Sequence, residues 1–101
     1  MGNDLFGLDR STRHKILQVL NQHYGIDEAI VYGSRAKGNY RPGSDIDISL
    51  KGDGLTLQEL NKITKELDEL DLPYQIDVSI YHQIDNIELV EHIDRVGVRF
   101  E

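Results

Sequence analysis

Two short groups of residues carry the strongest chemical signal in this sequence of 101 residues. The pair Gly33-Ser34 is followed, after ten further residues, by the triplet Asp45-Ile46-Asp47. Two aspartates separated by one residue on a β-strand point the same way, with Cα atoms about 6–7 Å apart. Their carboxylates repel each other, and Mg²⁺ relieves that repulsion, since proteins usually hold it with one or two carboxylates plus substrate phosphates. The spacing predicts a metal site at Asp45 and Asp47; the alternative is two solvated aspartates on an open sheet face.

The glycine–serine pair is expected to hold phosphate. Gly33 and Ser34 directly follow an apolar run, and therefore come at the end of a buried strand. Glycine lets a ligand approach the backbone closely, while free N–H groups and a serine hydroxyl can donate hydrogen bonds to an anion. Arg35 and Lys37 add positive charge nearby. These four residues predict a nucleotide-binding cradle for a triphosphate, and the alternative is a simple strand-to-helix turn.

A third aspartate lies in a second segment of alternating polar and apolar residues, from Tyr74 to Ile80. If this strand neighbours the strand of Asp45 and Asp47, and both turn their apolar faces to the helices, then Asp77 shares the opposite face with them. Three gathered carboxylates with two Mg²⁺ ions form the arrangement that clamps attacking and leaving oxygens in phosphoryl displacement. Asp77 is therefore predicted to be catalytic and a metal ligand, against the alternative of a charge that keeps an edge strand soluble.

The elements that must position these residues alternate between helices and strands. Apolar residues recur at helical spacing over residues 9–24, 56–70 and 86–96, and strands are expected at 29–32, 45–50 and 74–80. One helical turn is expected over 34–37. The order α-β-β-α-β-α predicts an α/β fold in which the helices pack on one face of a sheet.

Local signals refine these predictions. The helix N-caps are expected at Asp9 or Ser11, at Thr56 and at Asp85. The helical stripes are expected to turn their apolar residues inward, including Tyr24, Leu57 and Ile87. The apolar tail of Val98 and Phe100 either docks on the sheet or is offered to a partner. The histidines at 14, 23 and 92 are expected at the surface. His82 is expected in a loop after the third strand, with an approach to the site as the alternative, and no pair of histidines has the spacing of a zinc site.

Composition excludes several classes of function. The formal net charge is −7, from 11 basic and 18 acidic residues, which disfavours duplex nucleic acid as a partner. Cysteine is absent, which excludes disulfides, cysteine zinc sites and thiol nucleophiles. No apolar run is long enough for a transmembrane helix or a signal-peptide core, so we expect no membrane partner and a cytoplasmic location.

The stretch from Ile30 to Ile48 resembles the signature of the polymerase-β-like nucleotidyltransferase superfamily. At this length the sequence is most similar to the minimal nucleotidyltransferases, the MNT antitoxins of HEPN–MNT toxin–antitoxin pairs. The resemblance implies a single domain over residues 1–101 with a short mixed sheet of the α+β type. It also implies roles for particular residues: metal ligation by Asp45 and Asp47, help from Asp77 in activating the attacking hydroxyl and holding a metal, and triphosphate contacts by Gly33, Ser34 and Arg35, with Lys37 where many members carry arginine.

The reaction implied is Mg²⁺-dependent transfer of a nucleoside monophosphate, AMP from ATP, onto a hydroxyl. At this length we expect the acceptor to be supplied by a partner, and the resemblance implies a tyrosine of a HEPN ribonuclease toxin encoded nearby. One alternative is a non-catalytic antitoxin that acts by complex formation. Another is a nucleotidyltransferase for a small hydroxylated molecule such as an aminoglycoside. The sequence leaves a homo- or hetero-oligomer open.

Overall fold

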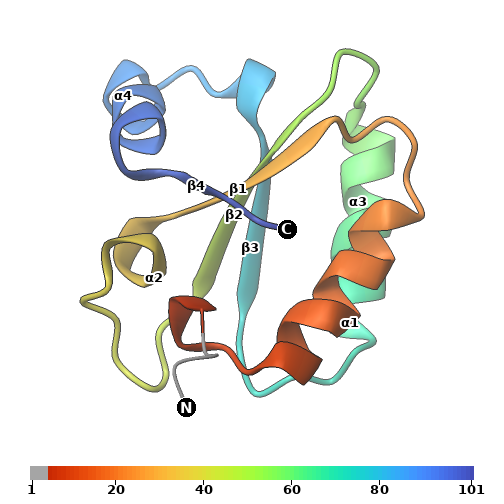
Figure 1. The fold of residues 1–101 in the computed structure, drawn as a ribbon. Helices are drawn as coiled ribbons and strands as arrows, with labels where there is room; N and C mark the ends of the chain where they lie inside the picture. The colour runs from red at the N-terminus through yellow and green to blue at the C-terminus, as the bar shows by residue number, and fades with distance from the viewer. Residues whose placement is uncertain (1–4) are drawn as a thin grey trace.

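Four strands form one mixed sheet in the order β3-β2-β1-β4 (Figure 1). The computed structural model describes residues 5–101 of the chain. β1 (Glu28–Tyr32) pairs antiparallel with β2 (Ile46–Lys51) and with the short β4 (Val98–Arg99), whereas β3 (Ile76–Ile80) runs parallel to β2. Parallel neighbours need a crossover connection, and α3 (Leu57–Asp68) provides it between β2 and β3.

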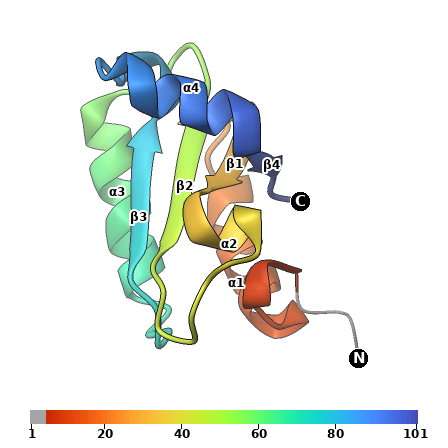
Figure 2. The same ribbon diagram turned by 90° about the vertical axis from the view of Figure 1, so that its left-hand side faces the viewer.

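Helices lie on both sides of this sheet (Figures 1 and 2). α1 (Arg10–Asn21) lies beside α3 on one face, and α2 (Gly33–Lys37) and α4 (Ile87–Val96) lie on the other. Two 3₁₀ segments, η1 (Leu5–Gly7) and η2 (Tyr81–Gln83), complete the described elements. Within residues 5–101 no helix combines the length and the apolar character needed to span a membrane.

The main core lies between the sheet and the pair α1 and α3. Alternate residues of β2 point into it, and their side chains are fully buried: Ile46, Ile48 and Leu50. The helices contribute Ile16 and Ile63, which are also fully buried. This is the alternation that the sequence predicts, and it leaves the other face of β2 free for polar residues.

A second, smaller cluster corrects one part of the predicted architecture. Ile30 and Tyr32 of β1 pack with Ile93 of α4 on the face away from α1 and α3. The α/β class and the order of the main elements are confirmed, but the helices do not all pack on one face. α4 is amphipathic, and it buries its apolar side on β1 instead of joining the first layer.

Two of the predicted helix caps are correct and one is wrong. The side chains of Asp9 and Thr56 cap α1 and α3 by accepting backbone N–H bonds of 2.8 and 3.2 Å. α4 begins one residue later than expected, so that Asn86 and not Asp85 is its N-cap and accepts the N–H of Leu89 at 3.2 Å.

Three apolar residues expected in the core are exposed instead. Tyr24 is 99% exposed because α1 ends at Asn21, before the turn that would have carried its side chain inward. Leu57 and Ile87 are the first residues of α3 and α4, where the helix has not yet reached the layer it packs against, and both are mostly exposed.

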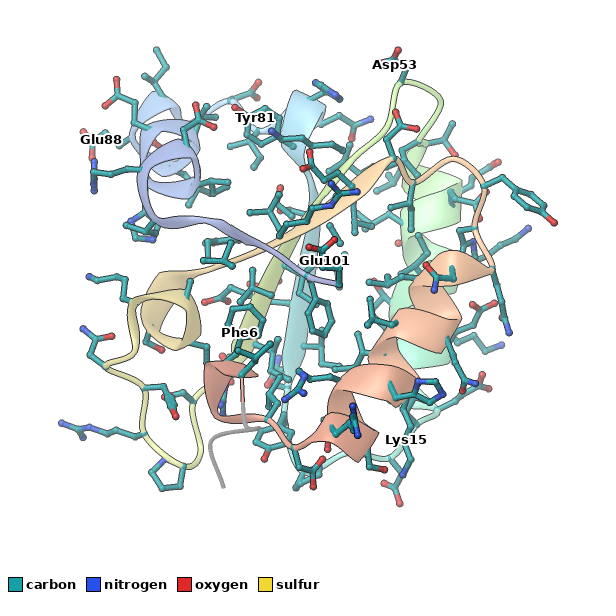
Figure 3. All side chains as sticks on the ribbon, viewed as in Figure 1. Phe6, Lys15, Asp53, Tyr81, Glu88 and Glu101 are labelled. Atoms are coloured by element: carbon teal, nitrogen blue, oxygen red, sulfur yellow. The ribbon has the colours of Figure 1, made fainter. Side chains whose placement is uncertain are left out.

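The C-terminal tail docks on the sheet, which settles the two alternatives for Phe100. Its N–H donates to the carbonyl of Ala29 at 2.8 Å, and its side chain is buried. Its ring meets edge-on that of Phe6, which is labelled in Figure 3, with the centroids 5.9 Å apart. Val98 remains largely exposed.

His23 is not the free surface residue that the sequence suggests. Its Nδ1 lies 2.5 Å from Glu59 Oε2, and its Nε2 lies 2.7 Å from Glu66 Oε1. The imidazole therefore links the segment that follows α1 to α3, because both glutamates that it contacts, Glu59 and Glu66, belong to α3.

Candidate active site

Asp47 and Asp77 are direct neighbours on adjacent parallel strands, since their Cα atoms are register partners of β2 and β3. Residues paired in this way point to the same face of a sheet. That face is the one on which α2 and α4 lie (Figure 2). Asp45 lies just before the first residue of β2 and is exposed. The structure therefore brings Asp47 and Asp77 together as the alternation predicted, with Asp45 two residues away along the chain.

The Asp47 carboxylate is in an unfavourable electrostatic environment. Its pKa is raised, first by burial and then by the negative charges of Asp77 and Asp45. Desolvation and like charges both disfavour an ionised carboxylate. A bound cation would remove this penalty, which gives a physical reason to expect one at this position.

The donors at this site fit magnesium. All three are carboxylates, and hard oxygen ligands favour Mg²⁺ over softer metals. In the described part of the chain, no three His, Cys, Asp or Glu side chains form a ready-made metal cage. Mg²⁺ usually takes one or two carboxylates and completes its shell with water and substrate phosphates. The geometry therefore suits an ion that arrives with the nucleotide, and the metal roles of Asp45, Asp47 and Asp77 stay a prediction.

Gly33 joins β1 to α2 at the point where the backbone meets the Asp47 carboxylate. Its φ is +73°, a conformation that side chains with a Cβ rarely adopt. A Cβ placed there would lie 2.6 Å from Asp47 Oδ2. Tyr32, the preceding residue, is the register partner of Asp47. The predicted phosphate cradle and the predicted metal site are therefore adjacent.

Ser34 and Lys37 keep the positions that their predicted roles need. The expected helical turn is present as α2, which Gly38 ends with a left-handed φ of +86°. Ser34 lies in its first turn and is partly exposed, and Lys37 lies in its last turn and is exposed. Both side chains are accessible to a ligand, and their contact with a triphosphate stays a prediction.

The side chain of Arg35 is buried in other contacts, so the predicted triphosphate contact would not come from its guanidinium. Its Nε and Nη2 donate to the Ser44 carbonyl at 3.1 and 2.8 Å, and its Nη1 donates to the Phe6 carbonyl at 2.8 Å. The rings of Tyr40 and Tyr74 lie over the guanidinium at 5.2 and 4.8 Å. With 3% of the residue exposed, the charge is not available to a triphosphate. Arg35 instead ties α2 to the residue that precedes the first aspartate.

Three hydroxyl side chains line the same face as the carboxylates. Ser79 Oγ donates to Ser49 Oγ at 3.3 Å, and Tyr32 lies on the same face, as the register partner of Asp47. The pKa of Tyr32 is raised, chiefly by burial and further by the charges of the neighbouring aspartates. The sequence carried a signal for the serines, since each lies two residues after an aspartate on its strand, but none for the tyrosine.

His92 was expected at the surface and is instead part of this face. It lies on α4 with its ring edge-on to Tyr32, the centroids 6.1 Å apart and the planes at 81°. Its charge acts to lower the pKa of Asp47, which places it within electrostatic reach of the carboxylates. No sequence pattern could have found it, because the position of α4 on this face is set by tertiary packing.

Residues 14–100 match the family model of the polymerase beta nucleotidyltransferase domain, and the chain belongs to this family. Its mixed α/β architecture agrees with the nucleotidyltransferase fold. The protein is therefore a nucleotidyltransferase.

The chain is similar to a protein of Methanocaldococcus jannaschii that bears the name "Putative protein adenylyltransferase". The two are 36% identical over 73 residues, which cover 71% of this chain and 76% of the relative.

Solved structures of toxin–antitoxin complexes share the fold. A toxin–antitoxin structure with AMP-PNP matches with a TM-score of 0.72 and 20% identity, over 88% of this chain and 72% of that chain. A structure of the tri-AMPylated Shewanella oneidensis HEPN toxin in complex with MNT antitoxin matches with a TM-score of 0.68 and 17% identity, over 91% of this chain and 71% of that chain.

Proposed function

We propose that this protein transfers AMP from ATP onto a hydroxyl of a partner protein in a Mg²⁺-dependent reaction. The observation that carries the proposal is the register pair of Asp47 and Asp77 beside Gly33. A nucleotide held at Gly33 and Ser34 would have its phosphates next to the carboxylates. Membership of the nucleotidyltransferase family supports the same type of reaction.

The transfer is a single displacement at phosphorus. The acceptor oxygen bonds to the α-phosphorus of ATP, the bond from that phosphorus to the bridging oxygen breaks, and pyrophosphate leaves with the electron pair. Asp77 takes the proton of the acceptor hydroxyl; it is exposed and lies on β3, the edge strand of the sheet, where an acceptor can approach. Backbone N–H groups at Gly33 and Ser34 orient the triphosphate, so catalysis is mainly positioning and electrostatics.

Asp45, Asp47 and Asp77 would hold magnesium, as two ions, together with the bound triphosphate. The metal would supply positive charge that offsets the negative charge of the phosphates. The raised pKa of Asp47 supports this assignment, because a cation would relieve the repulsion that raises it.

We propose a tyrosine of a HEPN-type toxin, encoded nearby, as the acceptor, so that the protein acts as an antitoxin. The name of the Methanocaldococcus relative refers to adenylylation of protein, and one structure that shares the fold contains an AMPylated HEPN toxin. These similarities support the choice of a protein acceptor over a small molecule.

Intact-mass spectrometry tests the proposal. The protein is incubated with Mg²⁺ and each NTP in turn, with and without the product of the adjacent gene. We expect the partner to gain one or more AMP adducts with ATP, and no adduct when Asp47→Asn replaces the wild type. A tight complex without any adduct would contradict transfer and indicate an antitoxin that acts by binding. Modification of an added aminoglycoside alone would contradict the protein acceptor.

A further inference from the structure

The burial of the Arg35 side chain leaves the proposed triphosphate site with one cationic donor fewer than the sequence suggests. A triphosphate carries several negative charges, and binding sites usually meet them with cationic or N–H-bearing side chains. The guanidinium of Arg35 is committed to the Ser44 and Phe6 carbonyls. Lys37 lies at the far end of α2 from Gly33. Near the start of α2, a further side-chain donor would therefore add to the N–H groups of Gly33 and Ser34.

α4 brings such a donor to the right place. It crosses the same face of the sheet as α2, and the two helices contact each other (Figure 2). The ring of His92 rests edge-on against Tyr32, at 6.1 Å and 81°. Tyr32 is both the residue before Gly33 and the register partner of Asp47. His92 therefore lies over the junction between the cradle and the carboxylates.

The burial of His92 is suited to a ligand contact. The residue is partly exposed, whereas Ile93 beside it is buried in the cluster that holds α4 on β1. Its influence on the pKa of Asp47 agrees with this proximity. The contact with Tyr32 fixes the plane of the imidazole and leaves its ring nitrogens to find partners elsewhere.

We infer that His92 donates a ring N–H to a non-bridging oxygen of the bound triphosphate, where the buried guanidinium of Arg35 cannot. The inference rests on the proposed function, because it needs the nucleotide at this site. A neutral imidazole keeps one N–H, so the contact does not require a protonated ring. The other role open to His92 is structural, namely ring packing against Tyr32.

Two substitutions separate these roles. His92→Phe keeps an aromatic ring against Tyr32 but removes the N–H, whereas His92→Gln keeps an N–H donor but removes the ring. His82→Phe is the matched control, because His82 also meets a tyrosine edge-on, at 5.6 Å and 85°, in η2. That tyrosine, Tyr81, follows the end of β3 beyond the pair of Ile80 with Leu50, away from the aspartates (Figure 3).

Isothermal titration calorimetry on the full chain measures the affinity for MgATP, for magnesium pyrophosphate and for AMP. We expect His92→Phe to weaken MgATP and pyrophosphate binding about tenfold, the loss typical of one hydrogen bond to a charged group. AMP binding should change much less. His92→Gln and His82→Phe should stay within about twofold of the wild type, because each keeps the donor at position 92.

The opposite pattern would overturn the inference. If His92→Phe binds pyrophosphate like the wild type, no phosphate contact exists, and if only His92→Gln is impaired, the role is ring packing. Should the Phe variant fail to fold in a thermal melt, His92→Met fills similar space without an N–H and gives the same comparison. A wild-type protein that binds no MgATP would overturn the proposed function itself, and that outcome is distinct from a selective result at His92.

Discussion

The two faces of β2 differ in what they contribute to the protein. Ile46, Ile48 and Leu50 turn to α1 and α3 and are completely buried in an apolar core. Asp47, between two of them in sequence, turns to α2 and α4. Burial and the neighbouring aspartates disfavour the ionised form of its carboxylate. The apolar face of β2 therefore stabilises the fold, whereas the polar face reduces stability in order to place a carboxylate at the site.

The largest effect should come from Asp47→Asn. We expect the rate of nucleotide transfer to fall on the order of a thousandfold, at the upper end for loss of one preorganised charged group.

The same change should raise the midpoint of thermal unfolding at neutral pH. Because burial and the other aspartates raise the pKa of Asp47 in the folded state, wild-type stability falls as pH rises through that pKa, and the amide removes the loss. Melts from pH 4 to 8 check the sign; a lower midpoint in the variant would contradict the comparison.

Ile48→Ala tests the contribution of the apolar face of β2 to stability, one residue after Asp47 in the same strand. The side chain is fully buried, and a large-to-small change at such a site costs about 3 kcal/mol in the free energy of unfolding. Urea denaturation measures the loss. Transfer assayed at low temperature, where the variant stays folded, should keep the wild-type kcat. A kcat that falls as far as in the Asp47 variant would mean that the two faces are not separable.

Gly33→Ala measures how closely the cradle and the carboxylate depend on each other. The new Cβ would lie 2.6 Å from Asp47 Oδ2, so the carboxylate must shift, and misplacement of about 1 Å can lower a rate by up to a hundredfold. The left-handed backbone adds roughly 1–2 kcal/mol of destabilisation.

Gly38→Ala is the matched control for this change. Its φ is +86°, and among residues 5–101 nothing beyond its own chain neighbours lies within 4 Å of its Cβ position, so the variant carries the backbone strain alone. Both alanine variants should melt lower than the wild type, but only the one at position 33 should lose transfer activity. Equal losses of activity would show that strain in α2, and not the contact with Asp47, is responsible.

The smallest effect is expected at His23, on the α1–α3 side. Burial alone would lower its pKa, but the hydrogen bonds and charges of Glu66 and Glu59 outweigh burial and raise it. The stabilising contribution is therefore complete below the ordinary histidine pKa of about 6.5 and is lost as pH rises through the folded-state value. Its size should be at most about 1 kcal/mol, because both glutamates are more than a third exposed.

His23→Gln should flatten the dependence of unfolding free energy on pH between 6 and 8, measured by urea denaturation, and leave transfer unchanged. A loss of transfer in this variant would contradict the prediction, because it would mean that a change on the α1–α3 side of the sheet alters the site on the α2–α4 side.

The sequence predicted most of the fold because periodicity is local. The alternation around Asp47 and around Asp77 was enough to place both on strands with their carboxylates on one face, and the parallel register then made them neighbours. The helical stripes were equally clear in their middles. The predicted burial was wrong at the helix ends, as at Tyr24 and Ile87, because apolar spacing does not show where a helix begins or ends.

The parts that could not be predicted depend on contacts between distant residues. Arg35 has the charge expected of a phosphate ligand, and only the approach of Phe6 and Tyr74 from other parts of the chain reveals that it is used elsewhere. His92 is the reverse case, a residue expected at the surface that lies at the site. Its helix, α4, is placed on the polar face by the packing of Ile93 against Tyr32, which the sequence does not show.

The guanidinium of Arg35 has a consequence for the length of the loop that follows α2. The guanidinium donates to the carbonyl of Ser44, nine residues further along the chain. The backbone from Arg35 to Ser44 is therefore closed into a loop by the arginine side chain. A residue inserted or deleted between Gly38 and Ser44 would therefore strain the contact between Arg35 and the Ser44 carbonyl, next to Asp45. The interval between Ser34 and the first aspartate, Asp45, is thus spanned by one arginine side chain as well as by the backbone.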